Sequence, residues 1–382
     1  MKRSKTRIKQ LLCLGLLGLF PWTLNAESTN EIAFNSIRQL GMGGAGSVVT
    51  FGDGSLLQNP ATLIGATNKI KILKTAIGID AASISKVTEL FSSLQSSGDA
   101  KDSRLDTISG LVPLDNHIDI MMTPISYTSK GFGVGLFSKA NINVQFKNKI
   151  LPQATIKATG VGAAVIGMAK PIEIGSMPLS VGASVKFLNQ VTLYNADTGA
   201  VGLSLSASEL LDLVDNTDVI NVATTQASGI GFDVGVLGKL SLPFGKGNWG
   251  VQFNNVATTL SGQKTVDSVV EKYTLEVPTT AMVGLGLMSE IPVLGSVKVA
   301  ADYKLVSPET SFFKNIFMGI EWSIFDDAIN VRAGLNQGYV TGGLGAKLWI
   351  FGMDYAYFMK ETGAEIGDKG IASHLVSMQI DI

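Results

Sequence analysis

The chain has 382 residues, of which only 16% are Asp, Glu, Lys or Arg, against about 25% in ordinary soluble proteins. Its net charge of −1 argues against nucleic-acid binding, which requires clustered positive charge. The single cysteine, Cys13, lies in an N-terminal apolar segment, so the rest of the chain offers no disulfide and no thiolate metal ligand. The chain is 46% hydrophobic but has no run of about 20 apolar residues, which indicates a membrane protein that crosses the bilayer as a closed β-barrel.

Residues 1–26 have the layout of a secretory signal peptide. Five basic residues precede an apolar stretch over 11–20 that is too short to span a bilayer, and Ala26 offers a small residue before Glu27. Cleavage there removes five of the 30 bases and none of the 31 acids, so the net charge falls from −1 to −6. An uncleaved membrane anchor is the alternative.

Residues 27–68 form the next segment, which is rich in Gly, Asn and Ser and shows no long alternation of apolar and polar residues. It is too long for a first turn, so we expect it to form a hatch that enters the barrel mouth. Gly41, Gly43 and Gly46 formally match the dinucleotide-binding spacing, but no hydrophobic strand precedes them. These glycines are better explained by tight backbone packing in the hatch.

Residues 69–382 alternate with a period of two, as barrel strands do when one face meets lipid and the other meets the lumen. Phe132, Val134 and Leu136, for example, alternate with glycines. The pattern predicts an all-β fold, a transmembrane antiparallel β-barrel of about 14 strands. The expected strands begin near residues 69, 117, 131, 154, 178, 226, 247, 277, 295, 314, 328, 340, 350 and 371.

Residues 83–112 and 207–220 interrupt the alternation and show helical spacing, the second behind a Ser208 cap. Such short helices belong in extracellular loops. Leu90, Phe91 and Leu94 form an apolar face that would line a hydrophobic entry groove. Alternatively, the helices pack against each other or against the barrel rim.

Charged residues also fall at predicted lumen positions of the C-terminal strands. We expect a charge network that braces the lumen, formed by Asp302, Glu321, Arg332, Lys347 and Asp354. His117 and His374 are the only histidines. Ser373 and His374 are adjacent on a strand and point to opposite faces, which disfavours a Ser–His hydrolase. Asp115, His117 and Asp119 share a face, but a polar strand-end cluster is the simpler interpretation than a metal site.

The segment 38–46, which reads RQLGMGGAG, and the segment 59–63, which reads NPATL, resemble the start of the FadL-like superfamily of long-chain fatty acid transporters, which includes PorV-like proteins. The resemblance covers residues 38–63. It implies a fourteen-stranded barrel with an N-terminal hatch in its lumen. The matching hatch positions are Gly41, Gly43, Gly44, Asn59, Pro60 and Ala61.

The resemblance implies a bacterial outer-membrane channel for passive uptake of long-chain fatty acids or other hydrophobic compounds, reached by Sec-type export. The alternative is a PorV-like interaction or secretion-assembly protein that binds secretion machinery and does not transport. We expect no enzymatic activity, no cofactor and no metal. The expected partners are outer-membrane lipid and a hydrophobic small molecule such as a fatty acid, not nucleic acid, and a monomer is the favoured state.

Overall fold

The structure is a computed structural model, which describes residues 32, 34–80, 86, 88–89, 92, 101–110, 112, 114–149, 153–175, 177–206, 208–209, 211, 222–243, 245–292, 295–306, 311–361, 365–368 and 370–382. The expected signal peptide, residues 1–26, lies outside the described residues. So do Leu90, Phe91 and Leu94 of the expected entry groove.

Within the described ranges, fourteen antiparallel strands form a closed ring, because β16 pairs with β1 and β8 pairs with β10. Each strand begins within four residues of its predicted start, which confirms the predicted barrel. The ring consists of β1 (Lys69–Asp80), β2 (Leu114–Ser129), β3 (Phe132–Lys147), β4 (Gln153–Ile174), β5 (Met177–Asn195), β7 (Val222–Leu242), β8 (Gly245–Val266), β10 (Thr280–Ile291), β11 (Gly295–Val306), β12 (Ile316–Ile324), β13 (Ile329–Asn336), β14 (Tyr339–Leu348), β15 (Phe351–Glu361) and β16 (Gly370–Asp381).

Two further strands lie outside this ring. β6 (Leu203–Ser206) pairs with the start of β4, and β9 (Val269–Val277) pairs with the second half of β8. β8 changes partner along its length, because its first half pairs with β10 instead. Asn255 and Ala257 have positive φ angles of 57° and 50° at this change, which is typical of a bulged strand. Alternation alone did not predict β9.

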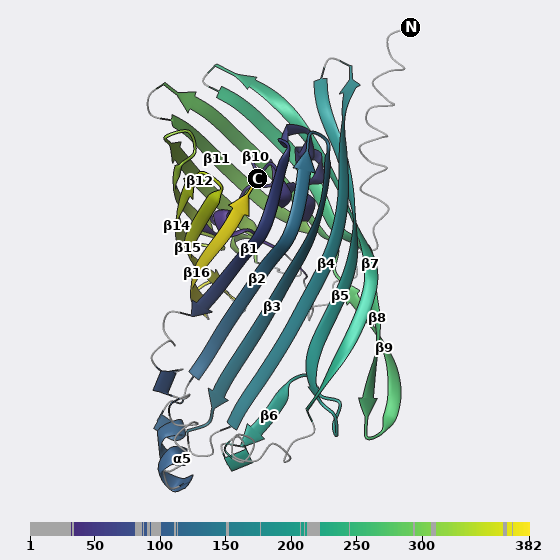
Figure 1. Cartoon of the computed structure of the whole chain (residues 1–382), viewed down its shortest axis with the longest axis vertical. Coiled ribbons are helices and arrows are strands. Elements are labelled where there is room, and N and C mark those ends of the chain that lie inside the picture. The colour runs from purple at the N-terminus through teal and green to yellow at the C-terminus, as the bar shows by residue number, and fades with distance from the viewer. Residues whose placement is uncertain are drawn as a thin grey trace.

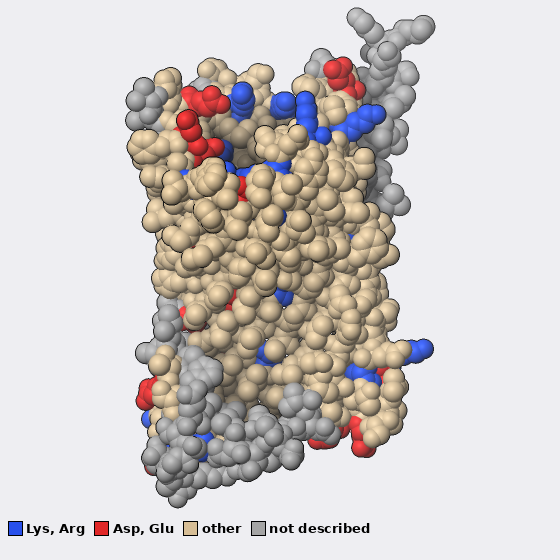
Figure 2. Space-filling model, in the orientation of Figure 1, with Lys and Arg blue, Asp and Glu red and all other residues tan. Residues whose placement is uncertain are grey.

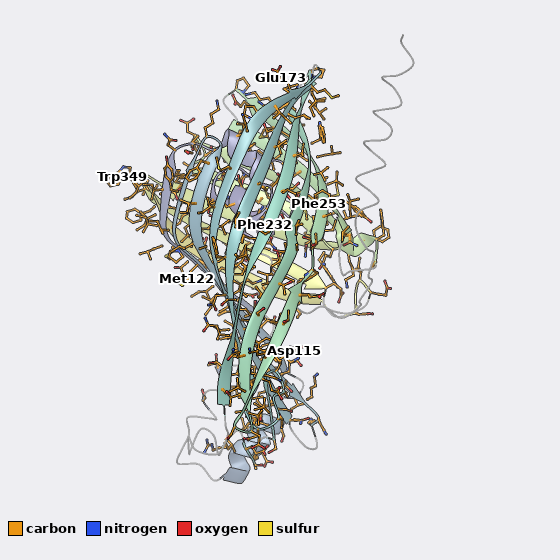
Figure 3. All side chains as sticks on the ribbon, turned by 90° about the vertical axis from the view of Figure 1, so that its right-hand side faces the viewer. Asp115, Met122, Glu173, Phe232, Phe253 and Trp349 are labelled. Atoms are coloured by element: carbon orange, nitrogen blue, oxygen red, sulfur yellow. The ribbon has the colours of Figure 1, made fainter. Side chains whose placement is uncertain are left out.

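The two ends of the barrel differ in their connections. At one end, called the turn end, consecutive strands are joined by short turns, as at residues 130–131 and 349–350. At the other, called the loop end, the connections include the long segments 81–113 and 196–221. Figure 1 shows the turn end upward and Figure 3 shows Glu173 there, with Asp115 toward the loop end. β4 and β8 have 22 residues each, whereas β12 and β13 have nine and eight, so one wall is much taller.

A broad apolar belt surrounds the barrel. Exposed side chains such as Phe232, Ile320 and Met378 point outward from their strands, and Figure 2 shows Lys, Arg, Asp and Glu gathered near the two ends. This surface suits contact with lipid hydrocarbon.

No helix of the described residues is both long enough and apolar enough to cross a membrane.

One helix and one loop cover the tall wall beyond this belt. In the described part of the predicted helix 83–112, α5 (Lys101–Gly110) buries Ile108 against Leu211, Phe146 and Leu205. Phe146 lies on the outward face of β3, so α5, β6 and Leu211 shield that face near the loop end. The helix cap differs from the prediction: Ser206, not Ser208, exchanges hydrogen bonds with Glu209. These described residues pack against the barrel rim, the alternative to a free entry groove.

Candidate functional site: the hatch and the cavity beside it

Three short helices lie inside the ring toward the turn end: α2 (Ile37–Gly41), α3 (Asp53–Leu57) and η1 (Pro60–Gly65) (Figure 1). Ser36 caps α2 through a reciprocal pair of hydrogen bonds with Gln39. α2 packs against β13 to β16, α3 against β2 to β4, and η1 against β3, β4, β5 and β7. The segment 36–65, called the hatch below, therefore touches most of the inner wall.

Glycines of the hatch and of the wall allow this close approach. Gly43 has a φ of 68°, and a Cβ placed there would lie 2.4 Å from the carbonyl oxygens of Met318 and Leu335. A Cβ on Gly319 of β12 would lie 2.2 Å from the Met42 oxygen. Backbone therefore meets backbone at this contact, and only glycine fits on either side. This explains why the lumen face of the strands is rich in glycine.

The Asn59-Pro60-Ala61 motif forms a compact corner against the opposite wall. The Asn59 side chain accepts a hydrogen bond from the Ala61 amide at 3.1 Å and donates one to the Val236 carbonyl at 3.4 Å. Pro60 begins η1, where its missing N–H costs nothing. Gly235 makes room for Asn59, since a Cβ there would lie 2.0 Å from its Oδ1.

A charge cluster joins α2 to the C-terminal strands. Glu321 accepts two hydrogen bonds from Arg38, at 2.6 and 2.7 Å, and others from Arg332 and Lys298 at 2.8 and 3.1 Å. Arg332 also donates to Asp354 at 2.6 Å. The structure thus brings together Glu321, Arg332 and Asp354 of the expected network. Sequence reasoning missed Arg38, although it begins the quoted hatch motif.

The other two members of the expected network lie apart from this cluster. Asp302 accepts hydrogen bonds from the backbone amides of Gly46 and Ser47, at 2.7 and 2.9 Å, and from the Ser47 hydroxyl at 2.6 Å. It fastens the glycine-rich loop of the hatch to β11. Lys347 lies 3.6 Å from Asp381, near the turn end.

A buried ion pair on the tall wall was also missed. Lys186 of β5 lies 2.7 Å from Asp233 of β7, and both side chains are almost fully buried. At the bulge of β8, the Asn255 side chain accepts a hydrogen bond from Lys186, and the Asn255 backbone N–H donates one to Asp233. Its side chain also donates to the Ile32 carbonyl at 3.4 Å. The alternation pattern placed Lys186 and Asp233 on the lumen face, but strand pairing was needed to bring them together.

A third ionic contact fixes α3. Asp53 lies 2.6 Å from Lys71 and 3.6 Å from Lys74, both on β1. Burial alone would raise the pKa of Asp53, but the two lysines outweigh it and hold this pKa well below its ordinary value. Leu73, between them, has a φ of 51° in a bulge, so Leu73 points outward and both lysines face the lumen.

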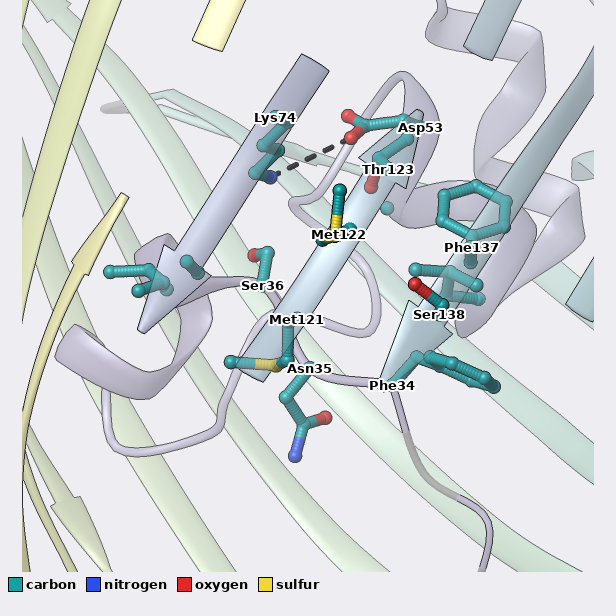
Figure 4. A pocket seen from close by; sticks show the side chains of 14 residues that line it. Phe34, Asn35, Ser36, Asp53, Lys74, Met121, Met122, Thr123, Phe137 and Ser138 are labelled. Carbon is teal, nitrogen blue, oxygen red and sulfur yellow. Dashed lines mark ion pairs between the residues drawn. The ribbon is translucent and has the colours of Figure 1, made fainter. Parts of the chain in front are cut away.

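A small cavity lies between the hatch and the wall at this point. Its volume is about 40 Å³, and its lining includes Phe34, Met121 and Phe137 as well as Asp53 and Lys74 (Figure 4). Such a volume holds a few water molecules, whereas an apolar cavity of about 150 Å³ is needed for a benzene-sized ligand. A hydrophobic ligand would therefore have to displace side chains here.

The wall beside the cavity is irregular. The pairing of β2 with β3 steps from Met122–Ser138 to Ile125–Leu136, so Thr123 and Pro124 form a bulge opposite Phe137. Pro124 can donate no ladder hydrogen bond. Met122 lines the cavity and is also 37% exposed on the outer surface. The β2–β3 ladder is therefore interrupted beside the cavity, and Met122 extends from the cavity lining to the outer surface.

The histidines lie away from the cavity and from each other. His117 contacts Asp115 at 3.6 Å and Asn143 at about 3 Å on β2 and β3. His374 is hydrogen bonded to the Tyr355 hydroxyl at 2.7 Å on β15 and β16. In the described part of the chain, no three His, Cys, Asp or Glu side chains gather in a way that could hold a metal ion.

No protein-family model matches the chain, and no curated protein matches its sequence. Among solved structures, the chain is similar to the Ralstonia pickettii toluene transporter TbuX, with a TM-score of 0.50, 13% identity, and coverage of 93% of this chain and 99% of TbuX. The Pseudomonas putida toluene transporter TodX gives a TM-score of 0.49, 12% identity and coverage of 93% and 99%. The likeness to TbuX concerns the fold: this chain shares the fold of TbuX and is a fourteen-stranded antiparallel β-barrel.

Proposed function

We propose that the protein is a bacterial outer-membrane channel for the passive uptake of hydrophobic compounds. The observation that carries the proposal is the cavity that joins the hatch to the bulged wall at β2 and β3. The solved structures similar in fold include a toluene transporter, which agrees with this assignment. Short turns face the periplasm in bacterial barrels, so the loop end would face the cell exterior and receive the ligand.

The proposed route follows apolar side chains. On the loop-end side of the hatch, Phe137, Val165, Leu188 and Leu260 of the tall wall pack with Phe34 and Leu56 into one hydrophobic cluster. Phe34 and Phe137 belong to this cluster and also line the cavity. A ligand that follows this surface reaches the cavity and then the bulge at Pro124. It would leave sideways at this bulge, past Met122, into the membrane.

Within this class, we propose an amphiphile with an acidic head, such as a long-chain fatty acid, as the preferred substrate. Lys74 and Asp53 line the cavity beside the apolar residues. Because Asp53 is shared between Lys71 and Lys74, one positive charge is left over at the edge of the cavity. A carboxylate would be stabilised there, whereas a neutral hydrocarbon would gain nothing from it.

The test is uptake of labelled oleate and labelled toluene by cells that lack their own transporter. Met122→Trp should block the wall at the Pro124 bulge and lower uptake of both compounds about tenfold. Passage there needs a mobile side chain, and tryptophan is bulkier and more rigid than methionine. Ile166→Trp is the matched control, because Ile166 is 46% exposed on the outer face of β4 and does not line the cavity.

Uptake by the wild type that falls in Met122→Trp and persists in Ile166→Trp supports the channel and its sideways exit. Equal uptake by both variants would refute that exit. No uptake of either compound by the wild type, with a barrel shown to be folded by heat-dependent gel migration, would refute the channel and favour the interaction role with secretion machinery.

A further inference from the structure

The lumen beside the hatch holds an excess of positive charge that hydrophobic uptake does not require. Ion pairs join seven bases and four acids there, so three positive charges within this group are unbalanced, while the whole chain has a net charge of −1. The ion pairs that define the group link Lys69, Lys71, Lys74, Lys347, Lys298, Arg38 and Arg332 with Asp53, Asp381, Glu321 and Asp354.

Four of these lysines, Lys69, Lys71, Lys74 and Lys347, follow one side of the hatch, whereas Lys298, Glu321 and Arg332 lie on β11, β12 and β13. The bulge at Leu73 keeps Lys69, Lys71 and Lys74 on the lumen side of β1, from the turn end to the cavity. Near the turn end, Asp381 lies 2.5 Å from Lys69 and 3.6 Å from Lys347. Each of Asp53 and Asp381 therefore faces two lysines, and each pairing leaves one unbalanced positive charge.

Polar atoms without partners lie along the same side. Among the described residues, the Ser377 hydroxyl and one carboxylate oxygen of Asp381 on β16 have no hydrogen-bond partner, although these residues are 1% and 5% exposed. Ser377 pairs in register with Ala76, which lines the cavity, and with Asp354. A buried polar group without a partner is destabilising, so these atoms require water or a ligand.

The remaining sides of the hatch are closed by other contacts. Toward β12 and β13 the hatch backbone meets wall glycines, and toward β3 to β5 it buries Leu56 and Leu63. Between the hatch and β1, β15 and β16, α2 buries Ile37 and Leu40 in an apolar cluster with Ala76, Ala356 and Leu375. The polar contacts of these strands lie closer to the turn end, and we call this polar part the hatch–wall seam. Figure 2 shows that the turn end of the barrel is hollowed and that Lys and Arg side chains lie in and around the hollow.

We propose that the hatch–wall seam is an anion-selective aqueous path between the cavity and the turn end. It would accept small anions or the carboxylate head group of an amphiphile, which share one chemistry. Unbalanced lysine charge raises the local concentration of anions and lowers that of cations. The proposal is independent of hydrophobic uptake, because a neutral compound that exits through the wall never enters the seam.

The test is the reversal potential of the purified barrel in a planar bilayer under a KCl gradient. The wild type should conduct and should favour chloride over potassium. Lys74→Gln/Lys347→Gln removes two unbalanced charges, yet leaves Asp53 with Lys71 and Asp381 with Lys69. This variant should lower the chloride-to-potassium permeability ratio about threefold or more.

Lys170→Gln/Lys246→Gln is the matched control, because it removes two exposed lysines near the turn end, on the tall wall. It should leave the ratio unchanged. Absence of conductance, cation preference, or an equal ratio in both double variants would overturn the proposal. These outcomes would leave toluene uptake intact, so they are distinct from failure of the channel itself.

Two additives distinguish the sources of the anion. Block of the chloride current by decanoate but not by decanol would place an amphiphile head group in the seam. Block by inorganic phosphate alone would assign the seam to free anions. Equal block by decanoate and decanol would mean that the alkyl chain, not the charge, occupies it, which would contradict the proposal.

Discussion

At the scale of single residues, the hatch is held by side chains that each serve several partners. Glu321 is 1% exposed and forms ion pairs with Arg38, Lys298 and Arg332 at once, whereas Arg38 contacts only Glu321 in that group. Removing the shared acid therefore leaves three cations together, while removing Arg38 leaves Glu321 with two partners. The two changes should differ in cost although both weaken the contact between Arg38 and Glu321.

Glu321→Gln should destabilise the docked hatch by about 3 to 5 kcal/mol, the cost of uncompensated buried charge. Arg38→Met should cost less than about half of that. Urea-dependent proteolysis of segment 36–65 in the folded barrel measures both. Equal sensitivity of the two variants would show that the Arg38 contact alone, not the shared acid, fixes the hatch.

Asp53 gives the hatch a dependence on pH whose sign follows from its lowered pKa. A carboxylate whose pKa falls on folding stabilises the fold above its ordinary pKa of about 3.9, and this contribution is lost as the pH falls toward the folded value. The difference in urea midpoint between wild type and Asp53→Asn should be constant from about pH 8 to pH 5 and should shrink below about pH 4. A difference that grows in acid would contradict the Lys71 and Lys74 assignment.

At the scale of elements, the fit between hatch and wall depends on glycine at defined strand positions. Gly319→Ala should force the hatch off β12, because the new methyl group would meet the Met42 carbonyl at 2.2 Å. The barrel should still form, since strand pairing is unaffected. Gly342→Ala on β14 is the control, because its nearest atom is 3.8 Å away. The expected result is a protease-sensitive hatch in Gly319→Ala only, with heat-dependent gel migration kept in both variants.

The sequence was informative about strands because lipid on one side and lumen on the other impose a strict period of two. It was uninformative wherever a bulge breaks that period. Leu73, Pro124 and Asn255 each shift the pattern by one residue, and each shift creates a feature of the site. Residues beyond a bulge change face, so Lys74 could not be assigned to the lumen from alternation.

The contacts of the candidate site were predictable only in part, for a different reason. Lumen-facing acids and bases on neighbouring C-terminal strands could be grouped in advance, as for Glu321 and Arg332. Their partners from the hatch could not, because Arg38 and Glu321 are 283 residues apart and no periodicity relates them. Asp302 likewise contacts the Gly46 and Ser47 backbone, which side-chain chemistry alone does not reveal.

At the scale of the whole molecule, the tall wall continues beyond the lipid-facing belt. On β7 the outward side chains change from Ile230, Phe232 and Val234 to Thr224, Gln226 and Ser228 toward the loop end, and all are exposed. β8 changes in the same way, to Thr259, Ser261 and Gln263. The hydrocarbon boundary on this wall therefore lies near Ser228, and the rest of the wall stands in water.

This boundary can be measured with single tryptophans in a background whose native Trp residues are replaced by Phe. Phe232→Trp should be quenched strongly by brominated lipid, because its side chain would lie within the belt. Gln226→Trp, six residues away on the same face, should be quenched weakly. Similar quenching at both positions would mean that the polar extension is buried in the membrane, contrary to the residue pattern.

The attachment of the hatch to the C-terminal strands also constrains how the chain assembles. Its anchors at Asp302, Glu321 and Thr341 are 255 to 300 residues away along the chain. Contacts between such distant residues close large loops and form slowly. The surface that binds the hatch is therefore incomplete until β11 to β14 have been added to the sheet. During insertion, the N-terminal segment would stay undocked while the barrel is still open. An assembly factor would be able to reach it in that state.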